Sequence, residues 1–219
     1  MMTKINNLDN YTYDFYVETC NLLKNSGFNP NRILDIGASA CETADITRRT
    51  WPEANILLIE GNDAFEQLYK SMNYQYHIKL LGKESGTTTF YKTKWSPVCS
   101  GNSIYRENSN TYNDNNVITE TLPIHKLDDV VLNTYDLIKI DTQGSELDII
   151  LGGINTFNKA KVVICEVALN DVNLGGCKKE DIINILVREL KFDYIHPIEA
   201  VLSSDNLRID YENLLFIKP

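Results

Sequence analysis

The chain has few of the residues that build zinc sites, disulfide frameworks or nucleic-acid surfaces. Its five cysteines are widely spaced and form no C-x-x-C pair, so we expect reduced thiols and neither zinc nor a disulfide framework. The formal net charge of -9 argues against a nucleic-acid partner, because phosphate contacts need lysine and arginine. The three histidines are isolated along the chain, and we assign them no role.

Long apolar runs are absent as well. No stretch reaches the length of a membrane span, so we expect no membrane insertion. The opening residues, MMTKINNLDN, contain no apolar signal-peptide core, and with the reduced cysteines this favours a cytoplasmic location. There is no internal repeat and no linker. A chain of 219 residues, 43% of them hydrophobic, predicts a single domain over residues 1–219.

The first third of the sequence alternates helices with apolar strands. An N-terminal helical segment, residues 1–31, contains an amphipathic pattern at 12–25. The strands and helices that follow form a β-α-β-α-β series, which predicts a parallel sheet with right-handed crossovers. Asp63 is the expected cap of the second helix of that series. The predicted strands are RILDIG, ANILLIE and YQYHIKLLG, and the predicted helices between them span 41–51 and 63–72.

The second half departs from this alternation. A Thr-rich segment, GTTTFYKTK, indicates a strand or hairpin, and the polar residues 95–120 indicate a long loop that we expect to bind substrate. The fold class is therefore α/β: a mostly parallel sheet flanked by helices, with a C-terminal antiparallel strand pair. The remaining predicted strands are DLIKID, KVVICEVA, DYIHPIEAVLSS and ENLLFIKP, and the remaining predicted helices are SELDIILGG and KKEDIINILVRELKF.

The turn RILDIGASACETADI lacks two of the three glycines of a dinucleotide-binding G-x-G-x-x-G motif. Ser39 and Glu42 stand at the second and third positions, and an acidic side chain there would repel a pyrophosphate. S-adenosylmethionine (SAM) has no phosphate, so the turn favours SAM over NAD. Glu60 ends the next strand, where an acidic side chain accepts hydrogen bonds from ribose hydroxyls. The alternative is that Asp35 and Gly37 only shape a strand-helix turn.

The segment LPIHKLDDVVLNTYDLIKIDTQGSELDIILGG closely resembles the FkbM family of SAM-dependent methyltransferases. The resemblance extends from residue 32 to the end, through ILDIGAS, LLIEGNDAFEQL, LLGKESGTTTFY and SGNSIYREN. The chain departs from the family at three positions: Ser39 replaces the usual Asn, Cys41 the usual Gly, and Gly61 a frequent Pro. The matching positions are Leu127, Asp128, Asp129, Lys139, Asp141, Gly144 and Glu146.

This resemblance implies a Rossmann-like class I methyltransferase that moves a methyl group from SAM, leaving S-adenosylhomocysteine. The implied acceptor is a hydroxyl of a sugar in a glycan or glycosylated metabolite, and a glycosyltransferase partner or fused domain would fit that role. The alternatives are a non-sugar small molecule, a non-catalytic module that scaffolds a glycan-assembly complex, and a NAD-dependent oxidoreductase. The implied cofactor-binding residues are Asp35, Gly37, Ala38, Ser39, Glu60, Gly61, Gly82 and Asp141.

An alcohol needs a base to remove its proton as it attacks the methyl group. Asp141 ends a strand beside the first one and is our first candidate, and Glu166, which ends the following strand, is the second. Lys139 lies two residues before Asp141 on the same side of its strand and could hold a carboxylate or a substrate oxygen. Glu146 either binds substrate or complements the N-terminus of its helix.

The polar loop supplies the expected substrate contacts, because amide, hydroxyl and aromatic groups suit a sugar. A divalent cation could also bind Asp141, Glu166 and Asp171 through oxygen, but the spacing does not predict one and we assign no metal. The substrate-binding candidates, together with Glu146, are Asn102, Ser103, Tyr105 and Arg106.

Overall fold

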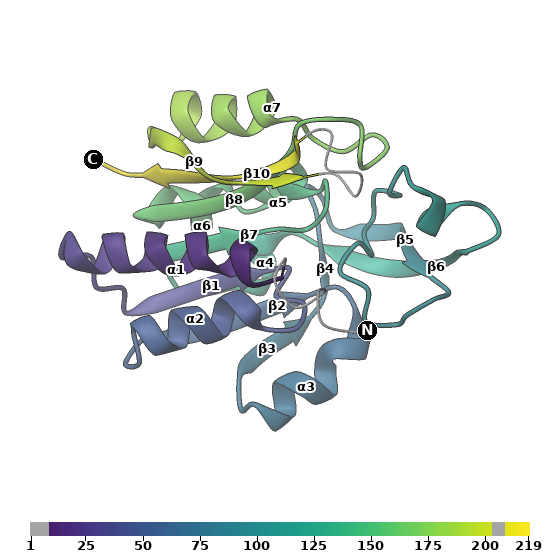
Figure 1. Ribbon diagram of the computed structural model, residues 1–219, viewed down its shortest axis with the longest axis horizontal. Coiled ribbons are helices and arrows are strands. Elements are labelled where there is room, and N and C mark those ends of the chain that lie inside the picture. Colours follow the sequence, from purple (N-terminus) through teal and green to yellow (C-terminus); the bar gives the residue numbers. More distant parts are fainter. Residues whose placement is uncertain (1–8, 203–208) are drawn as a thin grey trace, which may run out of the picture.

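The computed structural model describes residues 9–202 and 209–219. A seven-stranded sheet of order β3-β2-β1-β7-β8-β10-β9 forms its centre (Figure 1). The first five strands in that order are parallel, and β10 and β9 complete the sheet as an antiparallel pair, as predicted. The strands are β1 (Arg32–Ile36), β2 (Asn55–Glu60), β3 (Gln75–Ile78), β7 (Leu137–Ile140), β8 (Val162–Ala168), β9 (Asp193–Leu202) and β10 (Ile209–Ile217).

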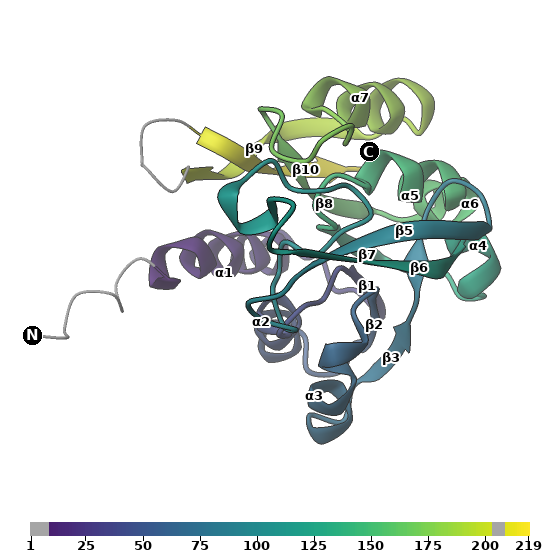
Figure 2. The ribbon, with the colours of Figure 1, turned by 90° about the vertical axis from the view of Figure 1, so that its right-hand side faces the viewer.

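Helices cover both faces of this sheet (Figure 2). One core cluster packs α1, α2 and α3 against one face, and a second packs α4 to α7 against the other. Strands buried on both faces need continuous apolar sequence, which explains the run in β8. The helices are α1 (Asp9–Asn25), α2 (Glu42–Thr50), α3 (Glu66–Ser71), α4 (Leu127–Val130), α5 (Glu146–Gly152), α6 (Ile154–Lys159) and α7 (Lys179–Ile183).

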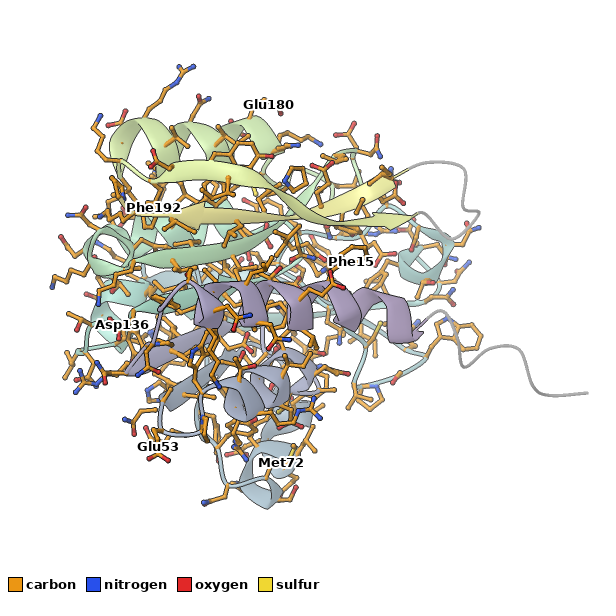
Figure 3. All side chains as sticks on the ribbon, turned by 60° about the vertical axis from the view of Figure 1, so that its left-hand side comes forward. Phe15, Glu53, Met72, Asp136, Glu180 and Phe192 are labelled. Carbon is orange, nitrogen blue, oxygen red and sulfur yellow. The ribbon has the colours of Figure 1, made fainter. Side chains whose placement is uncertain are left out.

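Helix α1 lies across the sheet with its apolar stripe inward. Tyr16, Cys20 and Leu23 are buried, whereas Phe15 points away from the sheet and is 45% exposed (Figure 3). The predicted amphipathic helix is therefore confirmed over the described residues, and the expected segment before residue 9 lies outside them. No helix in the described part of the chain combines the length and apolar character needed to cross a membrane.

A second, three-stranded sheet of order β4-β6-β5 stands beside the first. It contains β4 (Leu80–Leu81), β5 (Gly86–Thr93) and β6 (Val117–His125). The predicted single strand YQYHIKLLG is wrong, because the chain leaves the main sheet at Lys79 and both leucines pair with β6 instead. The expected loop 95–120 is also too long, since its last four residues pair with β5.

The helices differ from the expectations in several details. Asp63 is not the cap of the second helix: the Asn62 side chain accepts a hydrogen bond from the backbone of Ala64 at 3.2 Å. That helix begins as a 3-10 turn (Asp63–Phe65) before α3. The C-terminal helix continues past α7 as a π-helix (Asn184–Glu189), and a further 3-10 turn (Asn110–Tyr112) interrupts the polar loop.

Candidate functional site

A cleft that is partly open to solvent lies where β1, β2 and β7 end. The carboxyl ends of parallel strands are the usual place for ligand binding in such sheets. The small sheet and the polar loop supply the opposite wall. Its lining comprises Ile36, Gly37, Ser39, Ile59, Glu60, Gly61, Phe65, Lys79, Leu80, Leu81, Phe90, Cys99, Ser100, Asn102, Ser103, Ile104, Asp141, Thr142, Gln143, Ser145 and Ile149.

The Gly37 turn is packed directly on the end of β7. Gly37 has a φ of 78°, and a Cβ atom there would lie 1.7 Å from the carbonyl oxygen of Asp141. Only glycine meets both conditions. Ser39 and Cys41, which replace the family's Asn and Gly, also have positive φ, and Cys41 is buried at the start of α2. The turn therefore has a left-handed backbone not only at Gly37 but also at two positions occupied by Ser and Cys.

Glu60 ties this turn to the end of β2. Its carboxylate accepts hydrogen bonds from the backbone N–H of Ser39 at 3.0 Å and of Asn62 at 2.8 Å. Burial raises the pKa of Glu60, while these N–H donors act to lower it. Ala38, next to Ser39 in the turn, is buried and does not line the cavity.

Asp35 is a buried carboxylate that is only half satisfied. It is 2% exposed and does not line the cavity, contrary to its expected place among the cofactor contacts. Its Oδ2 accepts a hydrogen bond from Thr43 Oγ1 at 2.9 Å. Its Oδ1 is buried with no hydrogen-bond partner among the described residues. Leaving such an oxygen unpaired costs roughly 1–3 kcal/mol. Burial raises the pKa of Asp35, and Lys139, beside it in the sheet, acts in the opposite direction.

The two candidate bases and Lys139 form one network, in which Lys139 is buried and both carboxyl groups are partly buried. Lys139 Nζ lies 3.0 Å from Asp141 Oδ2, which agrees with their placement on one side of the strand. Burial would lower the pKa of Lys139, but the carboxylates of Asp141 and Asp35 raise it above its usual value. Burial would raise the pKa of Asp141, but Lys139 lowers it. The expectation that Glu166 ends its strand is wrong, because β8 continues to Ala168 and Glu166 lies behind the cavity lining. Burial, followed by the Asp141 charge, raises the pKa of Glu166 well above the usual range.

Glu146 lies under the turn that links β7 to α5. It is 2% exposed, and its carboxylate accepts hydrogen bonds from the backbone N–H groups of Thr142 at 2.7 Å and Gly144 at 3.0 Å. These contacts shape the turn at the helix N-terminus, and Glu146 does not line the cavity. Gly82 is outside the lining too, with its carbonyl packed against Gly152.

The polar loop contributes two of its four candidates to the cavity. Asn102 and Ser103 line it, and Ser103 Oγ lies 3.0 Å and 2.9 Å from the carbonyl oxygens of Thr142 and Gln143. Asn102 accepts a hydrogen bond through Oδ1 from the backbone of Thr93, but its buried Nδ2 has no partner in the described residues. Like the Asp35 oxygen, this buried donor needs a hydrogen-bond partner that the described residues do not supply.

Tyr105 and Arg106 point elsewhere. Tyr105 donates a hydrogen bond to Asp148 at 2.6 Å, and Arg106 pairs with Asp114 at 2.8 Å. Periodicity does not specify side-chain direction in a loop, so the sequence could not separate these residues from Asn102 and Ser103. Asp171 is also remote, exposed and paired with Lys178. Within residues 9–202 and 209–219, no group of three or more His, Cys, Asp or Glu side chains could hold a metal ion.

Sequence reasoning missed several lining residues, and two of them left a signal. Lys79 directly follows the last residue of β3, close to the position of Glu60 at the end of β2. Gln143 lies inside the segment that carries the family resemblance, two residues after Asp141. The apolar walls from Leu81 and Phe90 left none, because nonlocal pairing of the small sheet brings them here.

Antiparallel β10 lies between β8 and β9, and the cavity opens at the Gly37 turn. This strand order is that of the class I SAM-dependent methyltransferase fold. A family model described as "Methyltransferase FkbM domain" matches residues 8–194. The chain therefore belongs to the FkbM methyltransferase family. A search of curated proteins gives no match.

Solved structures agree on the fold. The methyltransferase FkbM from Methylobacillus flagellatus KT superposes with a TM-score of 0.54 and 15% identity, covering 85% of this chain and 43% of that one. The N-methyltransferase NodS from Bradyrhizobium japonicum WM9 gives 0.53 and 12%, covering 96% and 98%. The magnesium protoporphyrin IX methyltransferase from Synechocystis PCC 6803, solved with bound SAM, gives 0.52 and 9%, covering 97% and 85%. This chain thus spans less than half of the FkbM neighbour.

Proposed function

We propose that this methyltransferase uses SAM to methylate a hydroxyl of a sugar in a glycan or glycosylated metabolite. When bound, SAM supplies a methyl group on an electrophilic sulfonium. The Gly37 turn and Asp35 would hold its amino-acid end, and Glu60 would accept hydrogen bonds from its ribose hydroxyls. A glycosyltransferase, separate or fused, would supply such an acceptor.

The observation that carries the choice of cofactor is the excess of carboxylate at the Gly37 turn, where Glu60 and Asp141 line the cavity and Asp35, behind the lining, has one unpaired oxygen. The nearby cation, Lys139, already pairs with Asp141, so the turn has more buried carboxylate than positive charge. A ligand with an ammonium group and a sulfonium would complete this site, whereas the pyrophosphate of NAD would add negative charge beside Asp35 and Glu60. The residues of this chain therefore fit SAM better than NAD.

The acceptor's hydroxyl proton would pass to Asp141, which lines the cavity and stays ionised beside Lys139. Asn102 and Ser103, on the opposite wall, provide amide and hydroxyl groups for the edges of a sugar. The unpaired Nδ2 of Asn102 is a donor that an acceptor oxygen would satisfy. These features support a hydroxylated acceptor, and the sugar itself comes from the family resemblance.

The test has a binding arm and a transfer arm. Calorimetry should detect SAM and S-adenosylhomocysteine but not NAD, and SAM should raise the melting temperature. Incubation with methyl-labelled SAM and a panel of glycans should then yield a labelled sugar by mass spectrometry. Absence of SAM binding would overturn the cofactor. If SAM bound but the methyl group went only to non-sugar alcohols, the proposed sugar acceptor would be wrong. If SAM bound and no methyl group were transferred, the result would favour a scaffolding module.

A further inference from the structure

One amide side chain holds the two candidate bases together. Gln143 has a φ of 56°, and its Nε2 lies 2.9 Å from Asp141 Oδ1 and 2.7 Å from Glu166 Oε2. An amide nitrogen carries two hydrogens, so it can donate one to each carboxyl group. The shared amide therefore holds the two carboxyl groups side by side. Two carboxylates this close repel each other, which favours a single proton on the pair.

The surroundings decide which carboxyl group holds this proton. Lys139 contacts Asp141 and keeps it ionised, whereas Glu166 is partly buried beside the Asp141 charge. The proton therefore belongs on Glu166. Lys139 is the cation in direct contact with the pair, and the other titratable groups around it are acids, a thiol and a phenol. The others are Asp35 on β1, Glu60 on β2, Glu146 on α5, Cys165 on β8 and Tyr211 on β10.

The reaction changes the charge in this buried site twice. Binding of SAM adds a sulfonium to a cavity lined by Asp141 and Gln143. In the transfer, the bond from sulfur to the methyl carbon breaks and sulfur keeps the electron pair, while the bond from oxygen to that carbon forms. The positive charge on sulfur disappears and the acceptor releases its hydroxyl proton. A group that loses a proton in the first event and gains one in the second keeps the site's charge constant.

We propose that Asp141 and Glu166, held by Gln143, form a one-proton store that empties when SAM binds and refills with the acceptor's proton during methyl transfer. Asp141 touches the cavity, and Glu166 and Gln143 act through it as positioning residues. This inference rests on the proposed function, since it needs a sulfonium cofactor and a hydroxyl acceptor. It adds that cofactor binding and proton release are coupled before any acceptor is present.

Calorimetry in buffers with different heats of ionisation measures this coupling without an acceptor. SAM should release up to about one proton more than S-adenosylhomocysteine, and its affinity should rise with pH by up to about tenfold per unit over the window in which Glu166 is protonated. The sulfonium lowers the pKa of the SAM ammonium group relative to that of S-adenosylhomocysteine, so the two ligands are compared at a pH at which both free ammonium groups are fully protonated. Equal proton release by both ligands would overturn the proposal while leaving SAM binding intact. Failure of SAM to bind would instead remove the proposed function.

Two variants identify the groups involved. Glu166→Gln removes the titrating carboxyl and should abolish the difference in proton release between the two ligands while SAM still binds. Gln143→Leu removes both donors and should change the pH dependence of SAM affinity. Gln75→Leu, at an exposed position on β3, is the matched control and should keep the wild-type value. If folded Glu166→Gln protein, judged by circular dichroism, released the same excess of protons, the store would lie elsewhere.

Discussion

At the scale of single residues, Asp128 is an acidic residue with a structural role. It follows Leu127 in the L-D-D segment that resembles the FkbM family, yet it lies away from the cavity. Its carboxylate accepts bonds from the backbone N–H groups of Asn155 at 3.1 Å and Thr156 at 3.0 Å, in the first turn of α6. The two side chains donate as well, at 2.8 Å and 2.7 Å. We expect Asp128→Asn to lower the free energy of unfolding by about 1–2 kcal/mol, because an amide nitrogen would face these donors.

Asp129→Asn is the control, since Asp129 is exposed and makes only a 3.4 Å contact with Ser85. Burial would raise the pKa of Asp128, but its hydrogen bonds lower it below the ordinary value of 3.8. The stabilisation is therefore complete above that value and is lost as the pH falls through the lowered pKa. Urea unfolding should show the wild-type advantage over Asp128→Asn shrinking in strong acid. An advantage that stayed constant there would refute the assignment.

At the scale of elements, the site depends on how closely the β1 turn approaches the end of β7. Gly37→Ala would place a methyl group against the Asp141 carbonyl and force an unfavourable positive φ on alanine. We expect it to cost more than about 1 kcal/mol of stability. We also expect SAM affinity to fall at least about tenfold, the equivalent of 1.4 kcal/mol, because the turn must move.

Gly86→Ala is the matched control, because a Cβ at Gly86 would meet no atom within 4 Å. Thermal unfolding and calorimetry with S-adenosylhomocysteine on both variants would measure the two effects. A Gly37→Ala protein that bound the ligand as tightly as Gly86→Ala would show that the close approach does not shape the cofactor site.

At the scale of the whole molecule, the sequence predicted the main sheet but not the small sheet that forms the opposite wall of the cavity. Apolar runs and helix periods located β1, β2, β7 and β8, and the meeting of their carboxyl ends placed Gly37, Glu60 and Asp141 in one cavity. The two-residue strand β4 was missed because its partner, β6, is some forty residues away and short runs carry no pairing information. Gln143 was missed because its position depends on a left-handed backbone that no pattern specifies.

A cavity built from separate segments and two sheets should respond to its ligand as one unit. Binding of S-adenosylhomocysteine at 100 times its Kd stabilises the folded state by about 2.7 kcal/mol. Hydrogen exchange should therefore slow together in the segments that carry the lining residues of both sheets, namely 36–39, 59–65, 79–81 and 141–145. The lining segment 99–104 should follow, because Ser103 bonds to the 142–143 carbonyls. Residues 179–189 do not line the cavity and serve as the internal reference. If protection were confined to 36–39, the small sheet and the loop would take no part in cofactor binding.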